Sequence, residues 1–131
     1  MAKIDVSLVT PERVVWTGQA TFVMARGSEG EVGILPGHAP LLLELGIGIL
    51  RIEDEGTVTR AAVHGGFLHV VGAEDSTRAD ILAESAELEN EVDAERAARA
   101  KEAAERRMAE SDDPEARGAL ARAETRLRIR T

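Results

Sequence analysis

The distribution of glycine and proline divides this chain into two unlike parts. Eleven of the 12 glycines and three of the four prolines lie before residue 83, and the remainder is rich in Ala, Glu and Arg. Glycine and proline mark turns between strands and are avoided inside helices, whereas Ala, Glu and Arg favour helices. The chain of 131 residues therefore predicts a β domain over residues 1–84 and a helical segment over residues 85–131.

Alternating apolar and polar residues indicate short strands in the first part. Residues 3–8 show the period of two that is typical of a half-buried strand. Further strands are expected over residues 14–16, 21–25, 47–52, 57–64, 67–71 and 76–82. Gly65 and Gly66 lie between two of these strands and predict a tight hairpin. About nine or ten short strands separated by turns predict a sandwich or a barrel.

The second part predicts a helical hairpin. Asn90 is the expected N-cap of a first helix that ends near Glu110, and Asp113 and Pro114 fit the N-cap and first position of a second helix. The least polar side of the first helix is mostly alanine, and that of the second presents Ala116, Leu120, Ala123 and Leu127. Alanine buries less apolar surface than leucine, at about 25 cal/mol per Å2. We therefore expect the hairpin to be the less stable part, able to dock on the β domain, undock or extend.

Charge and composition argue against several classes of function. The formal net charge of −8 disfavours nucleic acid as the main partner. The absence of cysteine excludes disulfides, cysteine-ligated zinc and thiol catalysis. No apolar run approaches the ~18 residues of a membrane span, and the first residues lack the apolar region of a signal peptide. We therefore expect a cytoplasmic chain that is not inserted in a membrane.

Catalytic and metal-binding motifs are also missing. The chain has neither a phosphate-binding Walker loop nor a nucleophile elbow. Residues 27–33 are glycine-rich but lack the spacing of a dinucleotide loop, which favours a turn or bulge. A hairpin could bring His64 near His69 as a metal-binding pair, although ordinary strand positions are the favoured interpretation. We expect no catalytic site, no metal site and no required cofactor.

Three segments resemble a known family. Residues 27–42, which read GSEGEVGILPGHAPLL, closely resemble the signature of the ε subunit of bacterial and chloroplast F-type ATP synthases. Residues 64–70 resemble the GGFLEV hairpin of that family, and residues 92–97 resemble the [IL]DxxRA motif that opens its helical hairpin. The order and spacing of these motifs agree over nearly the whole chain.

The resemblance implies a fold and a role. The fold would be an N-terminal ten-stranded β-sandwich with a C-terminal α-helical hairpin. The chain would be a non-catalytic rotor subunit of the central stalk, bound to the γ subunit and the c-ring at the cytoplasmic face of the cell membrane. It would couple proton translocation to ATP synthesis. The hairpin, when extended, would meet acidic loops of the β subunits and inhibit ATP hydrolysis.

The resemblance also implies site residues. Glu29 and Glu31 match the loop that meets the c-ring, and His38 lies in a matching loop close to the γ and c-ring contacts. Some members of the family bind ATP as a regulatory ligand. Their nucleotide contacts correspond here to Glu87, Val92, Asp93, Arg96, Ala97, Arg122 and Arg126. One further arginine of those members is replaced by Ala103.

Two other interpretations stay open. A free-standing ATP-sensing sandwich would be a stable monomer without affinity for γ, with a pocket between hairpin and sandwich. A small enzyme would need a convergent site of His or carboxylate side chains, which the sequence does not offer. A rotor subunit instead needs an apolar patch that binds γ. Periodicity does not separate the patch candidates from the core, and these candidates are Val9, Leu41, Leu42, Leu43 and Leu45.

Overall fold

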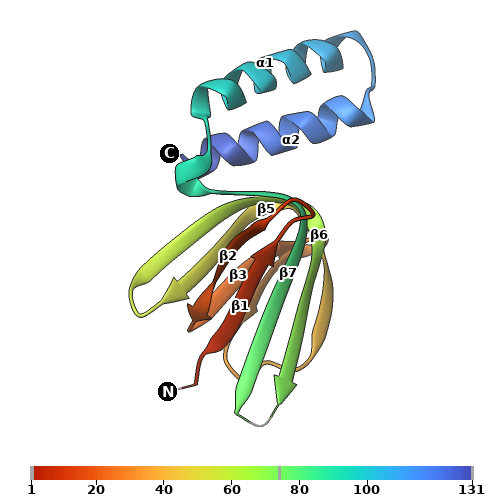
Figure 1. The fold of residues 1–131 in the computed structure, drawn as a ribbon. Coiled ribbons are helices and arrows are strands. Elements are labelled where there is room, and N and C mark those ends of the chain that lie inside the picture. The colour runs from red at the N-terminus through yellow and green to blue at the C-terminus, as the bar shows by residue number, and fades with distance from the viewer. Residues whose placement is uncertain (1, 74, 131) are drawn as a thin grey trace.

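A computed structural model, which describes residues 2–73 and 75–130, has a β-sandwich with two antiparallel helices across one end (Figure 1). The strands are β1 (Ile4–Val9), β2 (Val14–Ala20), β3 (Phe22–Gly27), β4 (Gly30–Ile34), β5 (Leu41–Asp54), β6 (Thr57–Ala73) and β7 (Ser76–Leu88). A 3-10 turn, η1 (Glu89–Glu91), leads into α1 (Ala94–Glu110) and α2 (Pro114–Ile129). The predicted sandwich followed by two helices is therefore confirmed.

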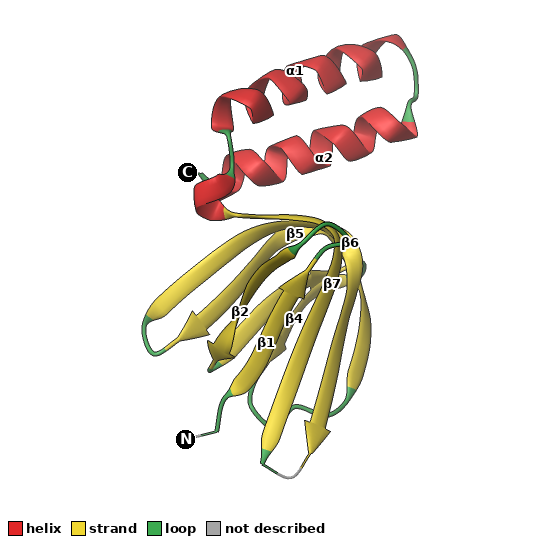
Figure 2. Ribbon diagram, viewed as in Figure 1, coloured by secondary structure: helices red, strands yellow, loops and turns green. Residues whose placement is uncertain are grey.

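The described strands form one sheet in the order β2-β1-β7-β6-β5-β3-β4. Neighbouring strands are antiparallel except for β1 and β7, which run parallel. The sheet folds back on itself, so that two layers enclose an apolar core (Figure 2). The large side chains that are fully buried there are aliphatic, among them Ile4, Leu8, Val23, Leu68 and Ile81.

The number of strands differs from the prediction. Instead of ten, the described residues form seven strands, because β5, β6 and β7 are 14, 17 and 13 residues long. Each of these long strands pairs along most of its length with a neighbour. The predicted break at residues 65–66 therefore falls inside a continuous strand, whereas those after residues 52 and 71 lie close to the ends of β5 and β6.

The predicted hairpin at Gly65 and Gly66 is wrong. In a two-residue hairpin His64 would pair with Phe67, but both residues pair with β5 on one side and β7 on the other, in unchanged register. Gly65 has φ 75° and Gly66 has φ 115°, a backbone region that favours glycine because it has no Cβ. The two glycines therefore bend β6 without ending it.

The start of α1 also differs from the prediction. Asn90 lies in η1, and the N-cap is Asp93, whose extended backbone (φ −90°, ψ 102°) suits that position. Its Oδ1 accepts a hydrogen bond from the Arg96 backbone N at 3.0 Å. At α2 the predicted cap is confirmed, because Asp113 accepts from two backbone N–H groups and Pro114 occupies the first turn.

The hairpin is attached to the sandwich through α2. This helix lies between α1 and the sandwich and packs against β5 and β6 (Figure 1). At its C-terminal end, Ile129 joins Ala62 and Val92 in a small buried cluster. The buried side chains of α1 are Ala97 and Ala104, as the alanine-rich pattern predicted. Among the described residues, no helix combines the length and apolar character that a membrane span requires.

Candidate functional site

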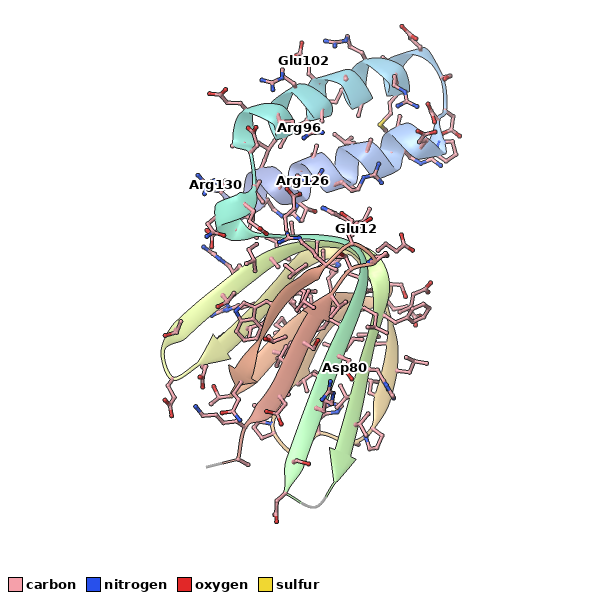
Figure 3. The ribbon with its side chains drawn as sticks, viewed as in Figure 1. Glu12, Asp80, Arg96, Glu102, Arg126 and Arg130 are labelled. Carbon is pink, nitrogen blue, oxygen red and sulfur yellow. The ribbon has the colours of Figure 1, made fainter. Side chains whose placement is uncertain are left out.

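A cavity of about 360 Å3 lies where the end of β7 meets both helices. Its walls come from segments far apart in the sequence, and Figure 3 shows Arg96 and Arg126 at the same end of the hairpin. The residues that line it are Ser85, Glu87, Glu91, Asp93, Arg96, Ala97, Ala100 and Arg126. The structure thus brings together Glu87, Asp93, Arg96, Ala97 and Arg126. These are five of the seven residues that the sequence resemblance aligned with nucleotide contacts.

Ion pairs and caps organise the charges of this cavity. Arg126 Nε donates to Glu87 Oε1 at 2.5 Å and so joins α2 to β7. Arg13 donates to both carboxylate oxygens of Glu91, at 2.9 and 2.8 Å. This Arg13 guanidinium, with the Leu88 backbone N–H, holds the pKa of the Glu91 carboxyl below its usual value. The cavity lining therefore carries two guanidinium groups, one of them already paired with Glu87, and three carboxyl groups. A guanidinium group suits a phosphate, and a carboxylate suits a hydrogen-bond donor.

The other two residues of that set lie elsewhere. Val92 is buried at the base of the hairpin, packed with Ala62 and Ile129. Arg122 lines a second cavity, of about 530 Å3, between α2 and the sandwich. The two cavities adjoin, because Ser85 and Arg126 line both.

The second cavity contains a residue that the sequence did not connect with the helical hairpin. His64 on β6 lines it together with Arg122 and Arg126, and is only 4 % exposed. Burial, followed by the nearby charges of Arg126 and Arg122, lowers the pKa of His64 from 6.5 to about 4. No alternation could indicate its position, because residues 61–64 are all buried.

The two histidines of β6 do not form a metal-binding pair. His64 is buried, whereas His69 lies five residues further along the strand on the exposed side. Among the described residues, no group of three or more His, Cys, Asp or Glu side chains could hold a metal ion.

The acidic residues predicted to meet the c-ring lie on the β3–β4 hairpin. Glu29 is in its turn, and Glu31 is on β4, paired with Arg26 of β3. Arg26 and Glu31 also line a cavity of about 460 Å3 whose other wall includes Thr125 of α2. Glu31 therefore faces the hairpin side of the sandwich in this docked arrangement.

His38 lies on a different turn, after β4. There the Gly37 backbone N donates to Thr77 Oγ1 at 2.7 Å, which places the turn beside the start of β7. The helices follow the other end of β7, so His38 lies at the end of this strand away from the hairpin. The structure does not bring His38 together with Glu31.

One outer face of the sheet carries a row of exposed apolar side chains. Phe67, Leu82, Val9 and Val14 occupy paired positions on β6, β7, β1 and β2. Three of them are strongly exposed: Val14 (61 %), Leu82 (54 %) and Phe67 (48 %). Adjacent exposed apolar groups of this size are typical of a binding surface. We call these four residues the apolar row.

The structure also divides the leucine run that periodicity left unresolved. Leu42 on β5 is 69 % exposed and pairs with His69, on the same face as the apolar row. Leu41 and Leu43 pack against the core, and Leu45 is buried. Of the five candidates for a γ-binding patch, Val9 and Leu42 therefore lie on the outer face.

The β-sandwich domain of the ATP synthase delta/epsilon chain, as a family model, matches residues 3–89. The chain belongs to the ATP synthase delta/epsilon family. The ATP synthase epsilon chain of Thermobifida fusca is 48% identical over 130 residues, covering 96% of this chain and 90% of the relative. That of Streptomyces griseus is 47% identical over 129 residues, covering 97% and 94%. The resemblance found in the sequence is confirmed, and the chain is a non-catalytic subunit of the ATP synthase.

Solved structures agree with this assignment. A chain in the structure of the Euglena gracilis mitochondrial ATP synthase, described as OSCP/F1/c-ring, is 30% identical and has a TM-score of 0.80. That match covers 95% of this chain and 79% of the other. A chain of the Tetrahymena thermophila central stalk and c-ring structure, 21% identical with a TM-score of 0.53, shares the fold.

Proposed function

We propose that this delta/epsilon-family chain is a rotor subunit of the central stalk that couples proton translocation to ATP synthesis. In this role it binds the γ subunit and the c-ring as a peripheral protein at the cytoplasmic face of the cell membrane. The apolar row carries the proposal, because a rotor subunit needs a surface that γ covers. The Euglena relative, whose structure is described together with F1 and the c-ring, supports the same placement.

The apolar row has the composition of a protein interface. Phe67 and Leu82 lie directly opposite one another on β6 and β7, so a partner could cover both at once. Burying their exposed surface contributes about 25 cal/mol per Å2. Polar residues border the row, among them Glu44 and Asp80 on the neighbouring positions of the same face. A central apolar region with a polar rim is typical of specific interfaces.

Changing the centre of the row tests this proposal. We expect the double variant Phe67→Ser and Leu82→Ser to bind the γ subunit at least ~30-fold more weakly, because central apolar contacts dominate interface energies. The control is Val58→Ser, which changes a 45 % exposed apolar residue of β6 outside the row. Titration of labelled γ measures both affinities. Equal affinity of the double variant and the control would contradict the proposal.

We propose that the hairpin inhibits ATP hydrolysis when it extends and contacts acidic loops of the β subunits. Undocking α2 would break the Arg126–Glu87 ion pair and free this guanidinium for an acidic partner. Arg122→Ala with Arg126→Ala should therefore weaken inhibition while γ still binds. Hydrolysis assays on the reconstituted complex measure inhibition, and loss of assembly would instead assign the two arginines a structural role.

We propose Glu29, Glu31 and His38 as contacts of the c-ring or γ. Because His38 lies on a separate turn, its contacts should be separable from those of the β3–β4 hairpin. The chain has no cysteine, so single cysteines at positions 29 and 38 can be crosslinked within the assembled enzyme. Crosslinking of neither position to the c-ring or γ would remove these residues from the interface.

We propose ATP as a regulatory ligand of the first cavity, which would hold the docked hairpin closed by mass action. Arg96 and Asp93 of the motif at residues 92–97 line this cavity together with Glu87 of β7, which supports the proposal. We expect Arg96→Gln to weaken ATP binding about tenfold, because a guanidinium–phosphate contact is lost. Arg106→Gln is the control, since Arg106 pairs with Glu102 on α1.

Calorimetric titration with ATP measures this effect. Equal affinities of Arg96→Gln and Arg106→Gln would contradict the site, and absence of binding at millimolar ATP would remove ATP as a ligand. ATP binding without affinity for γ would support the alternative of a free-standing ATP-sensing module.

A further inference from the structure

The interface between α2 and the sandwich buries an ionisable side chain that has no partner. His64 is 4 % exposed, and within the described part of the chain neither ring nitrogen has a hydrogen-bond partner. A buried polar group without a hydrogen bond destabilises the state that buries it, and a charged one does so far more. The docked hairpin therefore keeps this imidazole neutral.

The charges around His64 also oppose its protonation. From α2, Arg122 and Arg126 line the same cavity. From β7, Glu84 lines the cavity, and Glu87 is engaged by Arg126. The segment that β5 contributes, residues 45–47, is uncharged. Burial and the two arginines prevail over the carboxylates, and the pKa of His64 in the docked state falls to about 4.

We propose that His64 is a proton-operated switch that releases the helical hairpin from the sandwich on acidification. Undocking removes α2, and with it both guanidinium groups and the cover over the ring. The pKa of the imidazole then returns toward its ordinary value near 6.5. The undocked state therefore binds a proton that the docked state excludes.

The direction of the pH effect follows from this difference. Because docking lowers the pKa of His64, docking is fully favoured above pH ~6.5 and weakens as pH falls toward about 4. Between pH 7.5 and pH 5 the docking equilibrium constant should fall by about 30-fold. This window lies above the ordinary pKa of a glutamate, near 4.3. An effect of release on ATP hydrolysis rests on the proposed role of the hairpin, whereas release itself does not.

Spin-label distances in the full chain test the switch. The chain has no native cysteine, so labels at Glu12→Cys on the sandwich and Ser111→Cys between the helices report docking specifically. Both positions are exposed. We expect the docked distance to dominate at pH 7.5 and the ratio of docked to undocked chains to fall about 30-fold at pH 5.

Two histidine variants separate the switch from general acid effects. His64→Gln is neutral at both pH values and should keep the docked distance at pH 5. His69→Gln, which changes the exposed histidine of the same strand, should respond to pH as the unchanged chain does. A wild-type distance distribution that is the same at pH 7.5 and pH 5 would overturn the proposal, and so would a His64→Gln chain that still undocks.

A second measurement needs no variant. The ring of His64 can be followed by NMR, and we expect it to stay neutral for as long as the hairpin stays docked. Titration of this ring near pH 6.5 while the hairpin stays docked would overturn the proposal, because docking would then not exclude the proton.

Discussion

At the scale of single residues, Gly66 is the position where β6 tolerates a side chain least. Its φ is 115°, and a Cβ built there would overlap the Leu82 carbonyl oxygen and lie 2.7 Å from the Ala83 Cα. Both are backbone atoms of a paired strand, so they cannot move aside cheaply. We expect Gly66→Ala to lower the free energy of unfolding by about 3 kcal/mol or more. Urea denaturation measures the change.

The control for this change is Gly37→Ala. Gly37 also has a positive φ, 86°, but a Cβ there would meet no atom within 4 Å. Its replacement should cost about 1–2 kcal/mol of backbone strain alone. Equal losses of unfolding free energy in the two variants would mean that close contact with β7 adds nothing to the cost of a side chain at position 66.

Asp113 sets the start of α2 and makes it sensitive to strong acid. Its carboxylate accepts from the Glu115 and Ala116 backbone N–H groups and from Arg107 Nη2 at 2.7 Å. The Arg107 hydrogen bond, followed by that from Ala116, lowers the pKa of Asp113 below its usual 3.8. A lowered carboxyl pKa means that this stabilisation is present above pH ~3.8 and is lost as pH falls through the lower folded-state value.

We therefore expect Asp113→Ala to speed amide exchange in the first turn of α2 by roughly fivefold near neutral pH. The control is Asp112→Ala, since Asp112 pairs with Arg117 but does not cap the helix. Hydrogen exchange read by NMR measures both variants. Equal acceleration by the two would contradict the role of Asp113 as the cap.

At the scale of elements, α2 is held to the sandwich by the packing of its C-terminal end. Ile129 is 1 % exposed and packs with Ala62 and Val92. We expect Ile129→Ala to weaken docking by about 2–4 kcal/mol, because a buried isoleucine becomes a small cavity. Hydrogen exchange should then accelerate in α1 and α2 and stay unchanged in β5 to β7.

The control for Ile129→Ala is Leu127→Ala, which shortens a half-buried side chain of the same helix and should weaken docking less. If Ile129→Ala accelerates exchange in the long strands as much as in the helices, the hairpin and the sandwich unfold as one unit. In that case the hairpin is not the less stable part that its alanine-rich surface predicts.

Strand periodicity located the elements better than it located their ends. The alternation over residues 3–8 predicted β1 because that strand lies in a single layer with one face buried. It was lost over residues 61–64, where the main core covers one face of β6 and α2 covers the other, so that every side chain is buried. Whether Gly65 and Gly66 turn the chain or bend a strand depends on pairing with β5 and β7. Such pairing between distant segments is not visible in a local pattern.

The sequence predicted most of the residues of the candidate site, but not how they are arranged. The motif at residues 92–97 and the arginines of α2 indicated which side chains would meet, and five of seven line one cavity. The positions of the other two residues depend on how α2 is rotated and docked on the sandwich. In this arrangement Arg122 lines the neighbouring cavity, and Val92 packs in the small buried cluster with Ile129. The burial of His64 beside the arginines of α2 could not be predicted, since its surroundings exist only once α2 covers β6.

At the scale of the whole molecule, the two parts have separate cores. The main core is built from strand residues alone, and the hairpin contributes Val92 and Ile129 to the small cluster on Ala62. A chain that ends at Glu91 keeps the main core and the ion pair between Arg13 and Glu91. We therefore expect it to fold with a melting temperature within roughly 5 °C of the full chain.

The same truncated chain separates the two roles proposed for the molecule. It retains the apolar row of Phe67, Leu82, Val9 and Val14, so it should bind γ with unchanged affinity. It lacks α1 and α2, so the reconstituted complex should hydrolyse ATP without the inhibition that the full chain exerts. Thermal unfolding, γ titration and hydrolysis assays on both chains measure these effects. Loss of γ binding would place part of that interface on the hairpin, and inhibition by the truncated chain would transfer the inhibitory role to the sandwich.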